Sequence, residues 1–298
     1  NLENDDAAAL SKARQWLDQA LSLDFEDSTT LNLMKGIGFW EDRTSKLGAC
    51  INDLDRADAL MGHWKAFQAF MDRNGMKDER IVHAFRSFVF GSMLDYLEAY
   101  NNPEGIRNSE VLWRVGLCNK MLGRLVPARK FLEAACRIDA QNAAILADLA
   151  DTLAMLEEDE LAKLLFREAF YLSPKDVVLE TMESALILRV IENVRAHGLP
   201  TPVHPYWIPI IGILTGVFTV TREIKPMEYG RLKQDVYALE REYQDARADR
   251  AILMPLLLNK YFWLLDHALQ SQQPRHTVNE ILLKLESLHP GVYKLYTK

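Results

Sequence analysis

Residues 109–142 read SEVLWRVGLCNKMLGRLVPARKFLEAACRIDAQN, and residues 143–176 read AAILADLADTLAMLEEDELAKLLFREAFYLSPKD. Both segments are 34 residues long, and their small and large apolar residues coincide when one is laid on the other. The matched pairs are Gly116 and Ala150, Ala128 and Ala162, Leu112 and Leu146, Val115 and Leu149, and Leu132 and Phe166. A fixed period of this length indicates a stacked structural repeat.

Each segment predicts two antiparallel helices joined by a turn. Apolar residues recur at spacings of three and four, which is typical of one helix face. Gly123 falls between the two helices, where a residue without Cβ adopts positive φ at little cost. Small residues such as Gly116 and Ala128 allow two helix axes to approach to ~8 Å. Pro174 closes the second segment, because proline cannot continue a preceding helix.

The two segments resemble the tetratricopeptide repeat family, a helix–turn–helix of 34 residues. The match is incomplete, since the aromatic residue of the family's first helix is replaced by Asn119 and Leu153. The closing proline, Pro174 in the second copy, is Ala140 in the first. The resemblance implies an all-α solenoid.

The resemblance also implies a concave, protein-binding groove lined mainly by the first helix of each repeat. The positions that match the family's groove-facing ones are Glu110, Trp113, Leu117, Lys120, Met121, Ala147, Asp151 and Met155. Trp113 and Met121 are the candidates for partner contact, because large apolar residues in an open groove favour binding. The alternative is that they pack against the helix expected at residues 78–100. Lys120 alone does not make the family's basic clamp for a chain terminus.

The whole chain is expected to be all-α, in three parts. Residues 1–196 are predicted to form the helical repeat domain, with a degenerate repeat at about 28–61 whose second helix begins at Thr44-Ser45. Residues 197–209 carry four prolines, which predict an extended connection rather than a helix. Residues 210–298 are predicted to form a smaller C-terminal helical module.

The other local expectations concern helices and their ends. Ala13, Leu17 and Ala20 carry the small–large–small spacing of a repeat's second helix, whose first helix would lie before Asn1. We expect Ser109 to cap the strong pair, and Asp176 to cap a helix that runs to about Ala196. Further helices are expected at residues 7–22, 54–71, 78–100, 226–248, 252–270 and 277–287, with a connection at 101–105.

Charge and cysteine usage exclude some classes of protein. The 298 residues carry a formal net charge of −7, which argues against nucleic acid as the main ligand. The chain has three cysteines, Cys50, Cys118 and Cys136. An odd number at irregular spacing does not indicate a disulfide framework. Unpaired thiols favour the cytoplasm. The alternative is a bacterial periplasm, with a signal or anchor removed before Asn1.

The most apolar run is too short for an ordinary membrane helix. Residues 206–220 include fifteen positions, whereas spanning a bilayer takes ~20. We expect a buried core helix here, with an interfacial segment or a true span as the alternatives.

The sequence contains no zinc-protease, nucleophile-elbow, phosphate-loop or dinucleotide motif. We therefore expect no cofactor and no catalytic or metal site, and a non-enzymatic scaffold or adaptor that binds a peptide or partner subunit. A subunit of a bacterial envelope or motility assembly is a more specific version. The alternatives are an enzyme with a site near His204, Tyr206 and Trp207, or a lipid or small-ligand carrier that uses residues 206–220. The oligomeric state is left open.

Overall fold

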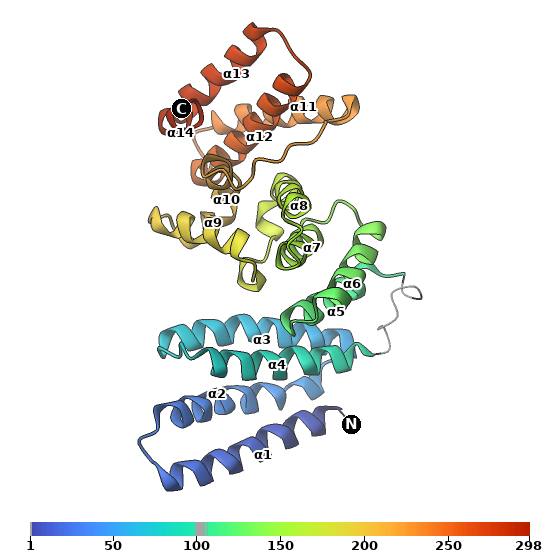
Figure 1. Cartoon of the computed structure of the whole chain (residues 1–298), viewed down its shortest axis with the longest axis vertical. Coiled ribbons are helices and arrows are strands. Elements are labelled where there is room, and N and C mark those ends of the chain that lie inside the picture. The colour runs from blue at the N-terminus through green and yellow to red at the C-terminus, as the bar shows by residue number, and fades with distance from the viewer. Residues whose placement is uncertain (1, 99–104, 106) are drawn as a thin grey trace. The chain divides into compact units, whose positions relative to one another are not determined.

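A computed structural model describes residues 2–98, 105 and 107–298, with side chains from Asp6 onward (Figure 1). This part of the chain forms fourteen α-helices and short 3₁₀ turns and contains no β-strand, which confirms the all-α prediction. The helices are α1 (Leu2–Leu23), α2 (Ser28–Thr44), α3 (Asp53–Arg73), α4 (Glu79–Tyr96), α5 (Ser109–Met121), α6 (Leu125–Ile138), α7 (Ala143–Met155), α8 (Asp159–Leu172), α9 (Ala185–Ala196), α10 (His204–Leu214), α11 (Pro226–Tyr243), α12 (Arg250–Gln270), α13 (Arg275–Leu288) and α14 (Pro290–Tyr296). The connection expected at 101–105 lies largely outside the described residues.

The chain divides into two compact units, Asn1–Asp139 and Ala140–Lys298. We call them the N-terminal unit and the C-terminal unit. The division falls between α6 and α7, three residues before the end of the first 34-residue segment, and the proline-rich segment 197–209 lies inside the C-terminal unit.

The two 34-residue segments each form a helical hairpin, α5 with α6 and α7 with α8. At the α5–α6 crossing, Leu132 packs so closely on Gly116 that a Cβ there would lie 2.7 Å from Leu132 Cγ. The turns of the hairpins share a left-handed residue at the same repeat position, Gly123 with φ 73° and Glu157 with φ 65°. The cap of α5 is Asn108, whose side chain accepts the Glu110 N–H, and not Ser109 as expected.

The core of the N-terminal unit is built on α3, whose inward face is the predicted one. Leu60, Trp64, Phe67 and Met71 are buried along it. Rings from α2 and α4 complete the cluster, with Trp40 and Phe85 centred 5.4 and 4.8 Å from Phe67.

The helix start expected at Thr44-Ser45 is wrong. α2 continues through Thr44, whose buried hydroxyl donates to the Trp40 carbonyl, so that Thr44 ends a helix instead of opening one. The following helix is α3, which begins after the capping side chain of Asn52.

In the C-terminal unit, the segment after Pro174 differs from the expected helix. Residues 177–184 are extended or 3₁₀, and α9 begins only at Ala185. The physical reason is a tertiary contact: the Asp151 carboxylate accepts the N–H groups of Glu183 and Ser184, each at 2.9 Å. Asp176 therefore does not cap a long helix.

The proline-rich segment is also partly helical, against expectation. α10 begins at His204 and includes Pro205 in its first turn, where the missing N–H would have no intrahelical partner. Pro209 lies inside the helix, where it removes one backbone hydrogen bond. The buried faces of α10 against α9 and α12 offset that loss.

The helical part of the apolar run 206–220 ends at Leu214, the last residue of α10. Gly216 then turns the chain with φ 72°, and Phe218 folds back over Gly212. The Phe218 ring stacks on Phe166 of α8 at 6.1 Å, so the end of this run fills the core beside α8.

Helix α12 is the central helix in the packing of α11, α12 and α13. Both α11 and α13 pack against it, and its residues Leu258, Phe262 and Leu265 are buried in the core cluster.

Candidate functional site

The structure buries most of the predicted groove positions. Leu117, Lys120 and Met121 on α5 are buried, as are Ala147 and Asp151 on α7. The remaining three, Glu110, Trp113 and Met155, are exposed or half-buried. Their role as a protein-binding groove stays a prediction, and it would require partner contact mainly through these three.

Several of these side chains have partners within the chain. Arg114 Nη2 donates to Glu110 Oε1 at 3.1 Å. The Arg114 guanidinium also donates two hydrogen bonds, of 2.5 and 2.9 Å, to the Asp58 carboxylate of α3. The Arg114 guanidinium lies 5.5 Å from the Trp113 ring centre. Helix α5 also packs against α4, the alternative that the sequence left open. These contacts tie α5 into the N-terminal unit.

The residues named for an alternative enzyme site lie at the start of α10. His204 is buried, and its Nε2 donates to the Leu199 carbonyl at 2.7 Å. Trp207 is half-buried against the core of the C-terminal unit, with its ring 5.8 Å from that of His289. Tyr206 is half-buried. The geometry gives His204 a structural hydrogen bond at this helix start.

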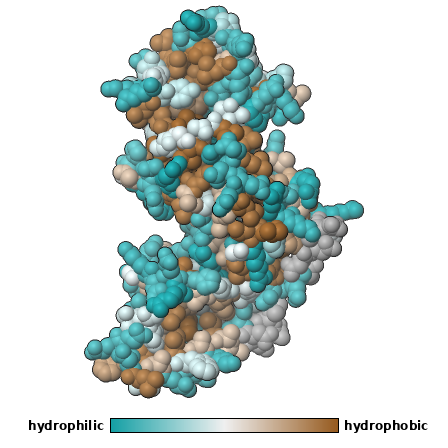
Figure 2. All heavy atoms as spheres, in the orientation of Figure 1, coloured by the Kyte–Doolittle hydropathy of each residue, from teal (hydrophilic) through white to brown (hydrophobic). Residues whose placement is uncertain are grey.

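An apolar groove opens in the N-terminal unit between α1, α2 and α4. Its volume is about 320 Å³. The lining residues are Ala9, Leu10, Ala13, Trp16, Leu17, Leu33, Ile37, Ala84, Phe85 and Phe88. All ten are apolar, and Trp16 is 65% exposed at the groove. Hydrophobic residues reach the surface in the region of α2 in Figure 2. We call this surface the N-terminal groove.

The face of α1 at the N-terminal groove has the residue spacing of faces that are fully covered elsewhere in the chain. Ala13, Leu17 and Ala20 of α1 have the spacing of Ala128, Leu132 and Ala135 of α6, and of Ala162, Phe166 and Ala169 of α8. The six residues on α6 and α8 are completely buried, in hairpins where a first helix covers this face. The three residues on α1 are only half-buried.

A second, charged cleft of about 590 Å³ lies in the C-terminal unit. Arg222 at its wall pairs with both Glu168 and Glu228, which raises the arginine's pKa. Lys260 lies 3.2 Å from Asp235 and 3.7 Å from the Tyr171 ring centre.

Burial changes the ionisation of two groups in this charged cleft. It lowers the pKa of Lys260 and raises the pKa of Tyr171 to about 12. Because the described charges at the centre of the cleft pair with one another, we interpret them as a network that joins α8, α11 and α12.

Three other properties of the described residues concern metal binding, membrane-spanning helices and the cysteine thiols. No group of three or more His, Cys, Asp or Glu side chains in this part of the chain is placed to hold a metal ion. Among the helices described, none combines the length and apolar character needed to cross a membrane. Burial raises the pKa of the Cys118 thiol strongly and that of Cys136 to about 12, and both are free thiols.

Comparison with known proteins identifies no relative. No protein-family model matches the chain, and neither a curated protein nor a solved structure matches it at a significant level.

The N-terminal groove was not predicted as a site from the sequence, although a signal for it was present. The small–large–small spacing of Ala13, Leu17 and Ala20 indicated a helix that normally has a partner. The spacing could not show that neighbouring helices leave this face partly open, because that depends on where α2 and α4 pack.

Proposed function

We propose that this protein is a non-enzymatic scaffold that binds an amphipathic helix of a partner protein in the N-terminal groove. The observation that carries the proposal is the half-exposed face of Ala13, Leu17 and Ala20 on α1. The same register on α6 and α8 is completely buried by a first helix. A partner helix in the groove would give α1 the same cover.

The proposal includes tetratricopeptide-like character for the two hairpins. It is supported by the 34-residue period, by the close contact of Leu132 on Gly116, and by the shared left-handed turn at Gly123 and Glu157. A helix laid in an apolar groove is a common mode of peptide recognition, with anchors at spacings of three, four and seven residues.

Trp16 is the expected energetic centre of the interface. Exposed tryptophans at grooves are frequent hot spots, where truncation costs ~2 kcal/mol or more. Since the side chain is 65% exposed in the free chain, its removal should affect binding far more than folding.

The test uses a labelled peptide with the sequence of residues 109–122, because α5 covers this kind of face on α6. Fluorescence anisotropy should show saturable binding to the full chain. Trp16→Ala should weaken binding by about tenfold or more, a loss of at least ~1.4 kcal/mol. Ala13→Arg, which places a charge in the groove, should abolish it.

The matched control is Ile51→Ala, which removes an apolar side chain that is 92% exposed and does not line the groove. This variant should bind as the parent does. Binding that survives Ala13→Arg, or no binding by the parent chain, would contradict the proposed groove.

A further inference from the structure

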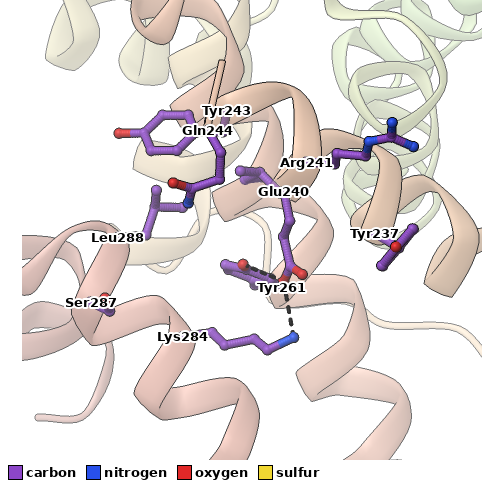
Figure 3. A pocket seen from close by; sticks show the side chains of 10 residues that line it. Tyr237, Glu240, Arg241, Tyr243, Gln244, Tyr261, Lys284, Ser287 and Leu288 are labelled. Atoms are coloured by element: carbon purple, nitrogen blue, oxygen red, sulfur yellow. Dashed lines mark hydrogen bonds and ion pairs between the residues drawn. The ribbon is translucent and has the colours of Figure 1, made fainter. Parts of the chain in front are cut away.

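A third cleft lies in the C-terminal unit between α11 and α13, with α12 as its floor. Both flanking helices pack on α12, and the cleft has a volume of about 460 Å³. Its lining residues are Tyr237, Glu240, Arg241 and Tyr243 of α11, Gln244 directly after it, Leu257 and Tyr261 of α12, and Lys284, Ser287 and Leu288 of α13. We call it the tyrosine cleft, after the three tyrosines (Figure 3).

The only carboxylate in this lining is already engaged. Glu240 Oε1 accepts the Tyr261 hydroxyl at 2.8 Å and the Lys284 ammonium at 3.0 Å, as the dashed lines in Figure 3 show. Burial and the neighbouring carboxylate raise the pKa of Tyr261, so that its proton remains on the phenol. Glu240 thus links α11 to both the floor and the opposite wall.

Apart from Leu257 and Leu288, the remaining lining groups are aromatic rings and hydrogen-bond donors. Tyr237 is 68% exposed, and Arg241, Gln244 and Ser287 are exposed on the two walls. Tyrosine, arginine, glutamine and serine side chains can all donate to a carbonyl oxygen. Leu257 and Leu288 are the only aliphatic residues in the lining, so the cleft lacks the wide aliphatic surface that an amphipathic helix needs.

We propose that the tyrosine cleft binds an extended, proline-rich peptide segment. A polyproline II helix makes no internal hydrogen bonds, so its carbonyl oxygens are available to donors while its proline rings pack on aromatic side chains. This ligand chemistry matches a lining of rings and donors. The segment would come from a partner protein.

The two tyrosines of α11 stand apart in the cleft. Tyr237 and Tyr243 are six residues apart, which is a rise of ~9 Å along the helix axis and a rotation of ~240° about it. Figure 3 shows their rings on either side of Glu240. A proline-rich segment in the cleft would therefore meet the two rings at separate points.

The charges that line the cleft further specify the residues of the bound segment. The cleft has two cations, Arg241 and Lys284, and one carboxylate, Glu240. An acidic residue beside the prolines would be attracted to the remaining positive charge. This inference is independent of the helix-binding groove proposed for the N-terminal unit.

The probe is the capped peptide EPPAPPAPPE, which is compared with EAAAAAAAAE by calorimetric titration into the full chain. The proline peptide should bind saturably and at least about tenfold more tightly than the alanine peptide. Tyr237→Ala should weaken binding by about tenfold. The matched control is Met227→Ala, which removes a 75% exposed side chain from the same helix but outside this cleft, and it should leave binding unchanged.

Gln244→Ala is a second variant, and circular dichroism melts establish that each variant is folded. Gln244→Ala should weaken the binding of the proline peptide several-fold, whereas Trp16→Ala should leave that binding unchanged. The inference is overturned if the parent does not bind the proline peptide, if both peptides bind equally, or if Tyr237→Ala binds as tightly as Met227→Ala.

Discussion

Replacing Gly116 by alanine tests whether this residue sets the crossing of α5 and α6. A Cβ at position 116 would lie 2.7 Å from Leu132 Cγ, 2.9 Å from Leu132 Cδ2 and 3.2 Å from the Leu132 backbone nitrogen. Leu132 is completely buried, so its side chain cannot turn into solvent. The two helices must therefore separate or rotate to accept the methyl group.

Two opposing terms determine the magnitude of this change. Replacing glycine by alanine inside a helix stabilises it by ~1 kcal/mol. Overpacking a close contact typically costs ~1–3 kcal/mol. The net effect of Gly116→Ala on the free energy of unfolding should be a loss of up to ~2 kcal/mol, obtained by subtracting the first term from the second.

Gly62→Ala is the matched control. Gly62 lies inside α3, is exposed, and has no atom within 4 Å of a Cβ. This variant should be more stable than the parent by up to ~1 kcal/mol. Both glycines belong to the N-terminal unit, so the same unfolding transition reports on them.

Urea unfolding followed by far-ultraviolet circular dichroism measures the difference. The two unfolding free energies should differ by up to ~3 kcal/mol, so with a slope of ~1–3 kcal/mol per molar urea the two midpoints should move in opposite directions and end up to ~1–3 M apart. If Gly116→Ala is stabilised as much as Gly62→Ala, the helices yield freely at this crossing, and the small residue does not set their approach.

Three further predictions concern the C-terminal unit. Gly212→Ala would press a Cβ into the Phe218 ring and should lower the unfolding free energy by ~1–2 kcal/mol in urea titrations; an unchanged midpoint would contradict this packing. Asp151→Ala should leave two N–H groups without their acceptor, cost ~2–3 kcal/mol, and speed hydrogen exchange at Ser184; unaltered exchange would refute the capping role. Hydrogen bonding to Arg222 lowers the pKa of Glu228 below its ordinary 4.5, so this pair stabilises the fold above pH 4.5, and the effect is lost as pH falls through the folded-state pKa. The urea midpoint of Arg222→Gln should therefore fall less than that of the parent as the pH is lowered from about 5 to 3. An equal fall in the two proteins would show that the pair does not contribute.

The sequence by itself determined most of the helices and the pairing within the two 34-residue hairpins. Residues at spacings of three and four, such as Leu60, Trp64, Phe67 and Met71, predicted their helix face correctly, because an amphipathic helix has only one way to bury its apolar stripe. Gly116 and Gly123 marked a close approach and a turn for reasons that hold in any context, since both depend on the missing Cβ. These features are local or lie within one hairpin.

The tertiary structure decided the features that depend on residues far apart in the chain. Residues 177–184 do not form a regular α-helix, and at their end Asp151, more than thirty residues earlier, accepts the N–H groups of Glu183 and Ser184. The prolines of 205–209 enter a helix because burial against α9 and α12 outweighs one lost hydrogen bond. Both candidate binding surfaces have the same origin. Trp16 is exposed and Tyr261 is buried because of which helices pack beside them, and periodicity along one helix contains no information about its neighbours.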